Sequence, residues 1–311
     1  MGTRRLTADD YMDSGAETGE SDCSPMSSIG SQLSLEGSQD PFLVVIHLIT
    51  NPGCSDILHN TIHKLLQWVT PDWPLFCAAE RASPLQCKKS YPSVFIQPAL
   101  AVIIFLQEKY GDKRILQLHD YLLHPPWQYH HTEHFTGKIL PYMPCTQDFF
   151  SLADGMPLWA IRQMHYGKEI IRYTIYCSFD HFEDMVALYK VILAHKVSYS
   201  KSDFCYFTLY STSNTDLQLS FKKLPKDMFP TPTESTILEF RVQELAQVVA
   251  MLPKPCSPIS DIRWQTEDYD GNKILLQVKW CSYVCDLNLN SLKLYCIIAA
   301  DNTNVFIGVL H

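Results

Sequence analysis

The pattern of hydrophobic and polar positions changes at residue 41 of this 311-residue chain. Residues 1–40 are rich in Ser, Gly and acidic residues and contain few large apolar ones. Such a segment cannot bury enough surface to offset the entropy of ordering, so we expect a disordered acidic tail. From Pro41 onward, short apolar runs alternate with stretches whose apolar residues recur at helical spacing, which predicts strands alternating with helices.

The apolar runs predict strands at Phe42–Ile49, Leu75–Ala79, Ala99–Leu106, Ile171–Cys177, Phe204–Tyr210, Leu217–Phe221, Ile237–Val242, Ile262–Thr266 and Lys273–Val278. Helical spacing predicts helices at 57–69, Lys113–Leu123, His181–Ala194 and Gln243–Leu252. Asp270-Gly271 stands between two apolar runs and predicts a hairpin, because Gly adopts a positive φ without steric cost. Residues 142–161 contain two prolines and follow a third, Pro141, and we expect them to be irregular.

The order of these elements predicts an α+β fold with two different halves. In residues 41–165, strand–helix–strand occurs twice, which is typical of a ferredoxin-like N-terminal half. In residues 166–278, a strand and a helix are followed by two further strands, and the unit then recurs. Such tandem βαβ(ββ) modules resemble glyoxalase-like, or vicinal-oxygen-chelate, domains, in which two paired modules close a curved sheet around a cleft. Residues 279–311 form an atypical C-terminal extension.

Composition excludes several classes of protein. Hydrophobic residues make up 46% of the chain, which is enough for a substantial core, and the net charge is −8. The tail contains eight acidic residues and two arginines and therefore carries most of that charge. Basic residues elsewhere form no continuous stripe, so we expect no nucleic-acid binding through the folded region. The longest apolar run, Ala99–Leu106, is too short to cross a membrane.

Eleven cysteines raise the question of disulfides or metal sites. None forms a C-x-x-C pair, their number is odd, no signal-peptide pattern precedes them and no N-x-[ST] sequon occurs. These features favour reduced thiols. We therefore expect an intracellular protein of the nucleus or the cytoplasm.

The most specific catalytic pattern is HHTEH at residues 130–134, which matches the H-x-x-E-H sequence of inverted zincins. That chemistry requires a helix, so that His130 and His134 share one face as zinc ligands while Glu133 activates water. Prolines precede the pattern, and residues 128–135 are predicted to be extended. In a strand, Glu133 points away from the face that carries both histidines. We interpret the stretch as a half-exposed polar strand, with a histidine-lined pocket as the alternative.

Two short motifs in the tail suggest regulation. Residues 13–18, DSGAET, resemble the DSGxxS phosphodegron that ubiquitin-ligase adaptors read, with Thr18 in place of the last serine. Ser14 and Thr18 are its candidate phosphosites, and Ser24, which precedes Pro25, is a candidate proline-directed site. The alternative is a solvated acidic tail with no regulatory role.

A resemblance to a known family extends from about residue 13 to residue 277. It is carried by the stretches DSGAETG, SQDPFL, ALAVIIFLQEKYG, LPYMPCTQDFFSL, PLWAIRQMHYGKEI and LPKPCSPISDIRWQTEDYDGNKILLQ. These resemble the vertebrate proteins called family with sequence similarity 124. The resemblance implies a glyoxalase-like fold, but no activity, cofactor or catalytic residue follows from it. After Val278 the sequence departs from the family pattern, in which a longer polar tail is expected.

The superfamily implied by this resemblance provides a test for metal chemistry. Its metal enzymes take one ligand near the start and one near the end of each module, from His, Glu or Gln. Aligned with that pattern, the ligand positions hold Tyr173, Gln218, Ile237 and Leu275. Only Gln218 can bind a metal ion. We therefore expect no metal, no other cofactor and no catalytic residue.

Two functions remain. The first is a non-catalytic module whose sheets and loops bind another protein, regulated by the acidic tail. The second is a metal-free enzyme or small-molecule binder that uses an aromatic cleft, with His165, Tyr173, Gln218 and Trp264 as pocket residues alongside the histidines at 130–134. Loss of metal ligands favours the first, so the balance is against an enzyme. An enclosed cleft with convergent polar groups would favour the second.

Overall fold

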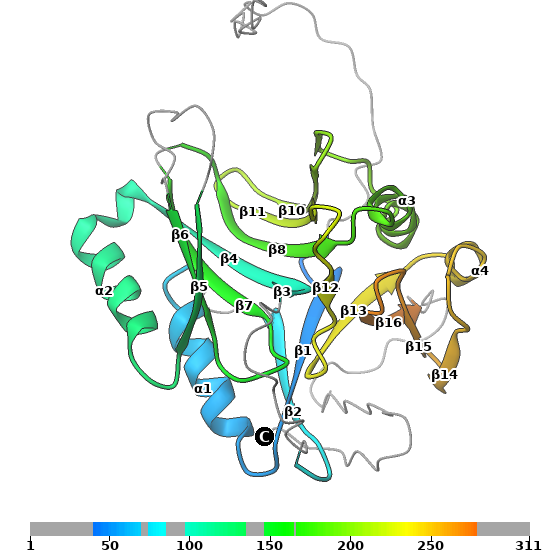
Figure 1. The fold of residues 1–311 in the computed structure, drawn as a ribbon, viewed down its shortest axis with the longest axis horizontal. Coiled ribbons are helices and arrows are strands. Elements are labelled where there is room, and N and C mark those ends of the chain that lie inside the picture. Colours follow the sequence, from blue (N-terminus) through cyan, green and yellow to red (C-terminus); the bar gives the residue numbers. More distant parts are fainter. Residues whose placement is uncertain (1–39, 70–73, 85–96, 135–145, 165, 279–311) are drawn as a thin grey trace, which may run out of the picture. The chain divides into compact units, whose positions relative to one another are not determined.

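The computed structural model describes residues 40–69, 74–84, 97–134, 146–164 and 166–278 (Figure 1). The predictions for the tail with Ser14, Thr18 and Ser24, for His165 and for residues 279–311 lie outside the described residues. Among the described residues, no helix has both the length and the apolar character needed to cross a membrane.

The described chain alternates strands with short amphipathic helices. The longer helices bury one stripe each; in the first, Leu58, Ile62 and Leu65 lie one turn apart and are buried. The helices are α1 (Ser55–Leu66), α2 (Asp112–Leu123), α3 (Phe182–Leu193) and α4 (Leu245–Val249), with a 3-10 turn η1 (Glu108–Tyr110). The strands are β1 (Val44–Thr50), β2 (Phe76–Glu80), β3 (Gln97–Pro98), β4 (Leu100–Gln107), β5 (Gln128–His134), β6 (Thr146–Ser151), β7 (Leu158–Met164), β8 (Glu169–Cys177), β9 (Tyr199–Ser200), β10 (Phe204–Ser211), β11 (Asp216–Lys223), β12 (Pro230–Thr231), β13 (Thr236–Val242), β14 (Ser257–Ser260), β15 (Arg263–Glu267) and β16 (Lys273–Val278).

Most strands belong to two large sheets built from repeated modules. The eight-stranded sheet has the order β5-β6-β7-β4-β8-β11-β10-β9, and the six-stranded sheet has the order β14-β15-β16-β13-β1-β2. In each module, the strand before the helix pairs in parallel with the last strand after it. Three modules have three strands after the helix, whereas β1-α1-β2 has one. The predicted α+β fold of tandem βαβ(ββ) modules is confirmed.

The pairing of modules differs from the prediction, which joined the two modules of residues 166–278. Instead, β13 pairs antiparallel with β1, and β8 pairs antiparallel with β4. Each large sheet therefore combines strands from residues 41–165 with strands from residues 166–278. These junctions form through backbone hydrogen bonds at the edges of the first strand of each module. The side-chain pattern of a strand does not indicate with which other strand its edge pairs.

The main core lies between the two large sheets and includes the helices (Figure 1). Phe76 of β2 in the six-stranded sheet contacts Tyr173 of β8 in the other sheet, with ring centroids 5.9 Å apart. Tyr189 of α3 contacts Phe221 of β11 and Phe240 of β13, and so joins both sheets. Because side chains alternate along a strand, each sheet also has an opposite face, which we call its outer face.

Strands β6 and β7 were not predicted, because the prolines of residues 142–161 suggested an irregular segment. Strand β6 forms between Pro144 and Pro157, and β7 begins directly after Pro157. Phe149 and Phe150 of β6 and Trp159 of β7 are almost fully buried. The prolines flank the ladder and remove no hydrogen bond from its interior, so tertiary burial determines the structure.

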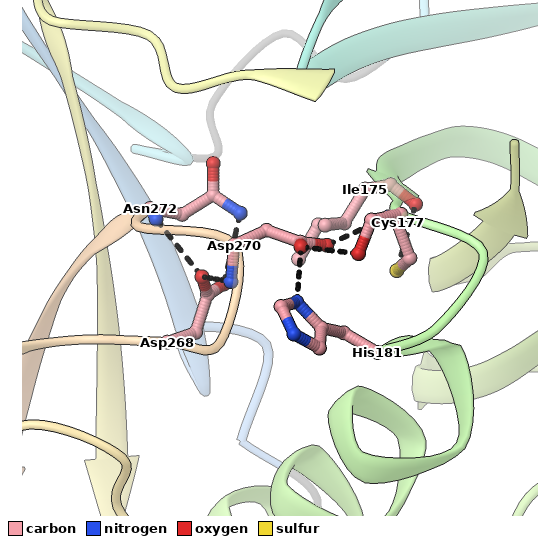
Figure 2. Close-up of polar contacts among 7 residues, drawn as sticks. Ile175, Cys177, His181, Asp268, Asp270 and Asn272 are labelled. Carbon is pink, nitrogen blue, oxygen red and sulfur yellow. Dashed lines mark hydrogen bonds and ion pairs between the residues drawn. The ribbon is translucent and has the colours of Figure 1, made fainter. Parts of the chain in front are cut away.

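The predicted hairpin is present, and its loop joins two modules (Figure 2). Gly271 has a φ of +82°, and β16 lies between β15 and β13 as an interior strand. The side chain of Asp270 accepts hydrogen bonds from the backbone (2.9 Å) and hydroxyl (2.7 Å) of Ser178 and lies 2.7 Å from His181 Nδ1. The loop of the last module is therefore attached to the junction between β8 and α3.

Candidate functional site

The outer face of the eight-stranded sheet is strongly curled. Glu133 of β5 lies 2.8 Å from Lys222 of β11, although these strands are five positions apart in the sheet. The hydroxyl of Tyr176 in β8 donates to the same carboxylate over 3.2 Å. In a flat sheet, five strand spacings would span about 24 Å. The curvature therefore turns the polar side chains of this outer face toward one another.

Two arginines occupy the centre of this outer face. Arg162 of β7 is the neighbour of Phe105 of β4, and Arg172 of β8 is the neighbour of Ile103 in the same strand. Both guanidinium groups lie over the Phe105 ring, at 5.9 Å for Arg162 and 4.8 Å for Arg172. Burial lowers the pKa of Arg172 to about 10, with a further contribution from the charge of Arg162. Both remain cations at neutral pH.

Polar and aromatic neighbours hold the arginines in place. Arg162 Nε donates to Gln147 Oε1 (3.2 Å), and Arg172 Nε donates to Gln218 Oε1 (2.8 Å). The guanidinium of Arg172 also lies 5.6 Å from the Phe204 ring and 5.3 Å from the Tyr206 ring, within the range of cation–π attraction. These contacts fix the orientation of both guanidinium groups.

The outer face of the six-stranded sheet has a different buried polar cluster. Glu239 of β13 lies 2.5 Å from His47 Nε2 and accepts a hydrogen bond from Arg263 Nε at 2.9 Å. Burial alone would raise the pKa of Glu239. The hydrogen bonds and charges of His47 and Arg263 more than offset that effect and hold the pKa below its usual value. Ile237 and Leu275 are buried on this face.

The structure does not bring Tyr173, Gln218 and Trp264 together. Tyr173 faces the main core, where its buried hydroxyl has no hydrogen-bond partner among the described residues. Gln218 is buried on the outer face of the eight-stranded sheet, and Trp264 is half-buried in β15 of the other sheet. At the ligand position assigned to Tyr173, the residue on the outer face is its neighbour Arg172. Arg162, Glu239 and His47 were not predicted as site residues. Each is a polar residue inside an apolar run, and this feature could have indicated them.

The HHTEH pattern is part of strand β5, as predicted, and is not helical. Glu133 points to Lys222 and Tyr176, whereas His131 stacks on Phe149 with ring centroids 4.9 Å apart. His130 Nδ1 lies 2.8 Å from His131 Nδ1. The part of the chain that the structure describes contains no group of three or more His, Cys, Asp or Glu residues placed to hold a metal ion.

Comparison with known proteins identifies the family. Residues 44–277 match the FAM124 domain. The chain belongs to the FAM124 family. It is 55% identical to FAM124A of Homo sapiens over 271 residues, covering 87% of this chain and 49% of that protein. It is 45% identical to FAM124B of Homo sapiens, covering 79% of this chain and 54% of that protein. The chain thus spans about half the length of the FAM124 proteins that it matches.

The solved structures that match this FAM124 domain have little sequence in common with it. A protein from Bacillus subtilis described as a candidate dioxygenase matches with a TM-score of 0.43 and 9% identity, covering 75% of this chain and 84% of the other. A glyoxalase/bleomycin resistance protein from Albidiferax ferrireducens matches with a TM-score of 0.26 and 14% identity, covering 34% and 97%.

Proposed function

We propose that this FAM124 domain is a non-catalytic binding module on a glyoxalase-like scaffold that has lost its metal ligands, and that its partner is another protein. One observation carries the loss of metal chemistry. Gln218, the predicted ligand position that could bind a cation, is held by Arg172, and Glu239, the buried carboxylate on the other outer face, is held by Arg263. A guanidinium beside the donor atom repels a divalent cation at short range.

Metal analysis of the purified protein tests this proposal. We expect far less than one equivalent of zinc, manganese, iron or nickel per chain, and no rise in melting temperature when zinc or manganese is added, because a bound metal would stabilise the folded state. Gln218→Ala and Glu239→Ala are the matched variants. About one metal per chain in the wild type, lost in either variant, would contradict the proposal.

The first two helices provide a candidate surface for the protein partner. Tyr121 of α2 donates to the carbonyl of Thr61 in α1 over 3.2 Å, so the helices are neighbours. Although each helix buries one apolar stripe, Ile57 is 62% exposed and Leu116 is 68% exposed. Exposed apolar side chains of this size are typical of interaction surfaces when they gather on one region.

Proximity labelling in cells tests this surface. We expect the double substitution Ile57→Glu and Leu116→Glu to remove specific labelled partners, because a buried glutamate would be desolvated at the interface. Phe229→Glu is the matched control, since Phe229 is also 68% exposed and lies between β11 and β12. Identical sets of partners for wild type and double variant would argue against the helices as the partner surface.

The free thiols of Cys54, Cys177 and Cys256 support an intracellular location.

A second candidate function is metal-free binding of a small molecule. It is favoured by one specific observation, the presence of Arg162 and Arg172 with aromatic rings on a curled sheet face. Convergent polar groups of this kind are typical of ligand sites.

A further inference from the structure

The strands that place metal ligands in glyoxalase-like modules, the first and the last of each, lie side by side at the centre of the eight-stranded sheet. Their order is β7-β4-β8-β11. On the outer face they present Arg162, Phe105, Arg172 and Gln218. Two fixed guanidinium groups therefore occupy the region where a metal-binding relative would hold a divalent cation. The positive charge of such a site is retained, although the metal ligands are not.

Two carboxylates and a lysine lie near these arginines. Arg172 lies 4.0 Å from a carboxylate oxygen of Glu169, a distance at the limit of an ion pair. Glu133 lies 2.8 Å from Lys222, whose charge compensates it most closely. The charge of Glu133 also attracts Arg162. Because Arg162 and Arg172 repel each other in a partly buried position, an anion between them would stabilise both.

We propose that Arg162 and Arg172 bind the carboxylate or phosphate group of a small organic anion on the outer face of the eight-stranded sheet, and that Phe105, Phe204 and Tyr206 contact its apolar part. The planar fork of a guanidinium matches both oxyanions with two parallel hydrogen bonds. The three rings surround Arg172 at 4.8–5.6 Å and add apolar surface beside the charge. This inference rests on the second candidate function and specifies the class of ligand.

Thermal unfolding of the full chain tests the proposal with four defined probes at constant ionic strength. These are benzoate, phenyl phosphate, inorganic phosphate and neutral benzamide, which has nearly the shape of benzoate. We expect benzoate, phenyl phosphate or both to raise the melting temperature by several degrees, and benzamide to leave it unchanged. The stronger of the two aromatic anions identifies the oxyanion. Inorganic phosphate should act more weakly, because it lacks an apolar part. Equal effects of the anions and benzamide would overturn the proposal.

Substitutions of the two arginines test where the anion binds. We expect Arg162→Gln and Arg172→Gln each to reduce the affinity for the preferred anion at least tenfold, and Arg172→Lys to reduce it as well, because lysine retains the charge but lacks the fork. The matched control is Arg114→Gln, since Arg114 of α2 also lies over aromatic rings, those of Trp68 and Tyr110, and should leave the affinity unchanged. Undiminished binding in both glutamine variants would overturn the assignment.

A second measurement uses only the wild type and therefore does not depend on whether a variant folds. Titration of the wild type with the preferred anion, followed by the side-chain Nε–H resonances of arginine, should shift Arg162 and Arg172 and leave Arg114 in place. Shifts of Arg114 alone, or of none of the three, would overturn the proposal. These outcomes would disprove the anion site alone. The proposal of a non-catalytic module would instead be disproved by stoichiometric metal in the elemental analysis.

Discussion

At the scale of single residues, Asp268 has the most strongly constrained charge of the hairpin loop (Figure 2). Its carboxylate is buried and accepts hydrogen bonds from Tyr189, from the backbone of Asp270 and from the backbone and side chain of Asn272, at 2.9–3.1 Å. Burial nevertheless raises the pKa of Asp268 to about 6, because the loss of water disfavours the charged form more than these donors favour it.

This shift has a defined consequence for stability. In the unfolded chain the carboxyl titrates near pH 4, so between about pH 4 and pH 6 the folded state binds more protons than the unfolded state. The contribution of Asp268 to the free energy of unfolding therefore rises as the pH falls through this window. We expect the difference in unfolding free energy, wild type minus Asp268→Asn, to increase by on the order of 1 kcal/mol between pH 7 and pH 5 in urea denaturation.

The comparison with the asparagine variant is necessary because two histidines titrate in the same window with the opposite sign. Burial lowers the pKa of His130 and of His131, so the unfolded state binds their protons first and stability is lost as the pH falls. That contribution cancels in the difference. A difference that stays constant from pH 7 to pH 5 would show that Asp268 is not buried in this network.

Single residues also show why the candidate site could not be fully predicted from the sequence. The strand that contains Tyr173 was predicted correctly, but the residue exposed on the outer face is Arg172. Strand β8 is buried along most of its length on both faces, so its sequence lacks the alternation that would distinguish them. A shift of one residue reverses the face of a strand. The register to β4 and β11, which only the folded sheet defines, decides the assignment.

At the scale of elements, the hairpin β15–β16 was predicted from the Asp-Gly signal. Leu275 is buried on the outer face, whereas Ile274 and Leu276 are in the main core. The loop itself was underestimated. The side chain of Asn272 is buried and donates to Asp268 Oδ2 over 2.9 Å, a contact that the turn signal does not indicate. Turn chemistry predicts the direction of the chain, and tertiary contacts determine which loop residues are essential.

Substitutions in this loop should therefore destabilise the protein to different degrees. Gly271→Val introduces a β-branched residue at a φ of +82°, which costs roughly 1–2 kcal/mol or more, and places its side chain against Pro232. We expect it to destabilise the protein more than Gly53→Val, which has a φ of +79° and open space around it. Asn272→Ser should cost about 1–3 kcal/mol through the lost hydrogen bond. Urea unfolding measures all three, and equal midpoints for the two valine variants would disprove the role of the loop.

At the scale of the whole molecule, the repeated modules are visible in the sequence but their assembly is not. Each large sheet is completed by a junction between distant strands, Val45 opposite Glu239 in one and Val102 opposite Tyr173 in the other. Strand periodicity predicts that such strands are buried, and leaves their partners undefined. The boundary predicted at residues 165–166 separates modules along the chain, whereas both sheets and the main core cross it.

The two halves should therefore be unable to fold separately. We expect residues 41–165 and residues 166–278, expressed alone, to show no cooperative thermal unfolding, because each would expose the edge of a central strand and half of the shared core. Co-expression should restore a complex that unfolds cooperatively and purifies as a one-to-one pair. The control is the uncut segment 41–278, which retains both junctions. If residues 166–278 alone unfold cooperatively as a monomer, they form a self-sufficient pair of modules, and the junctions of β1 with β13 and of β4 with β8 contribute little to stability.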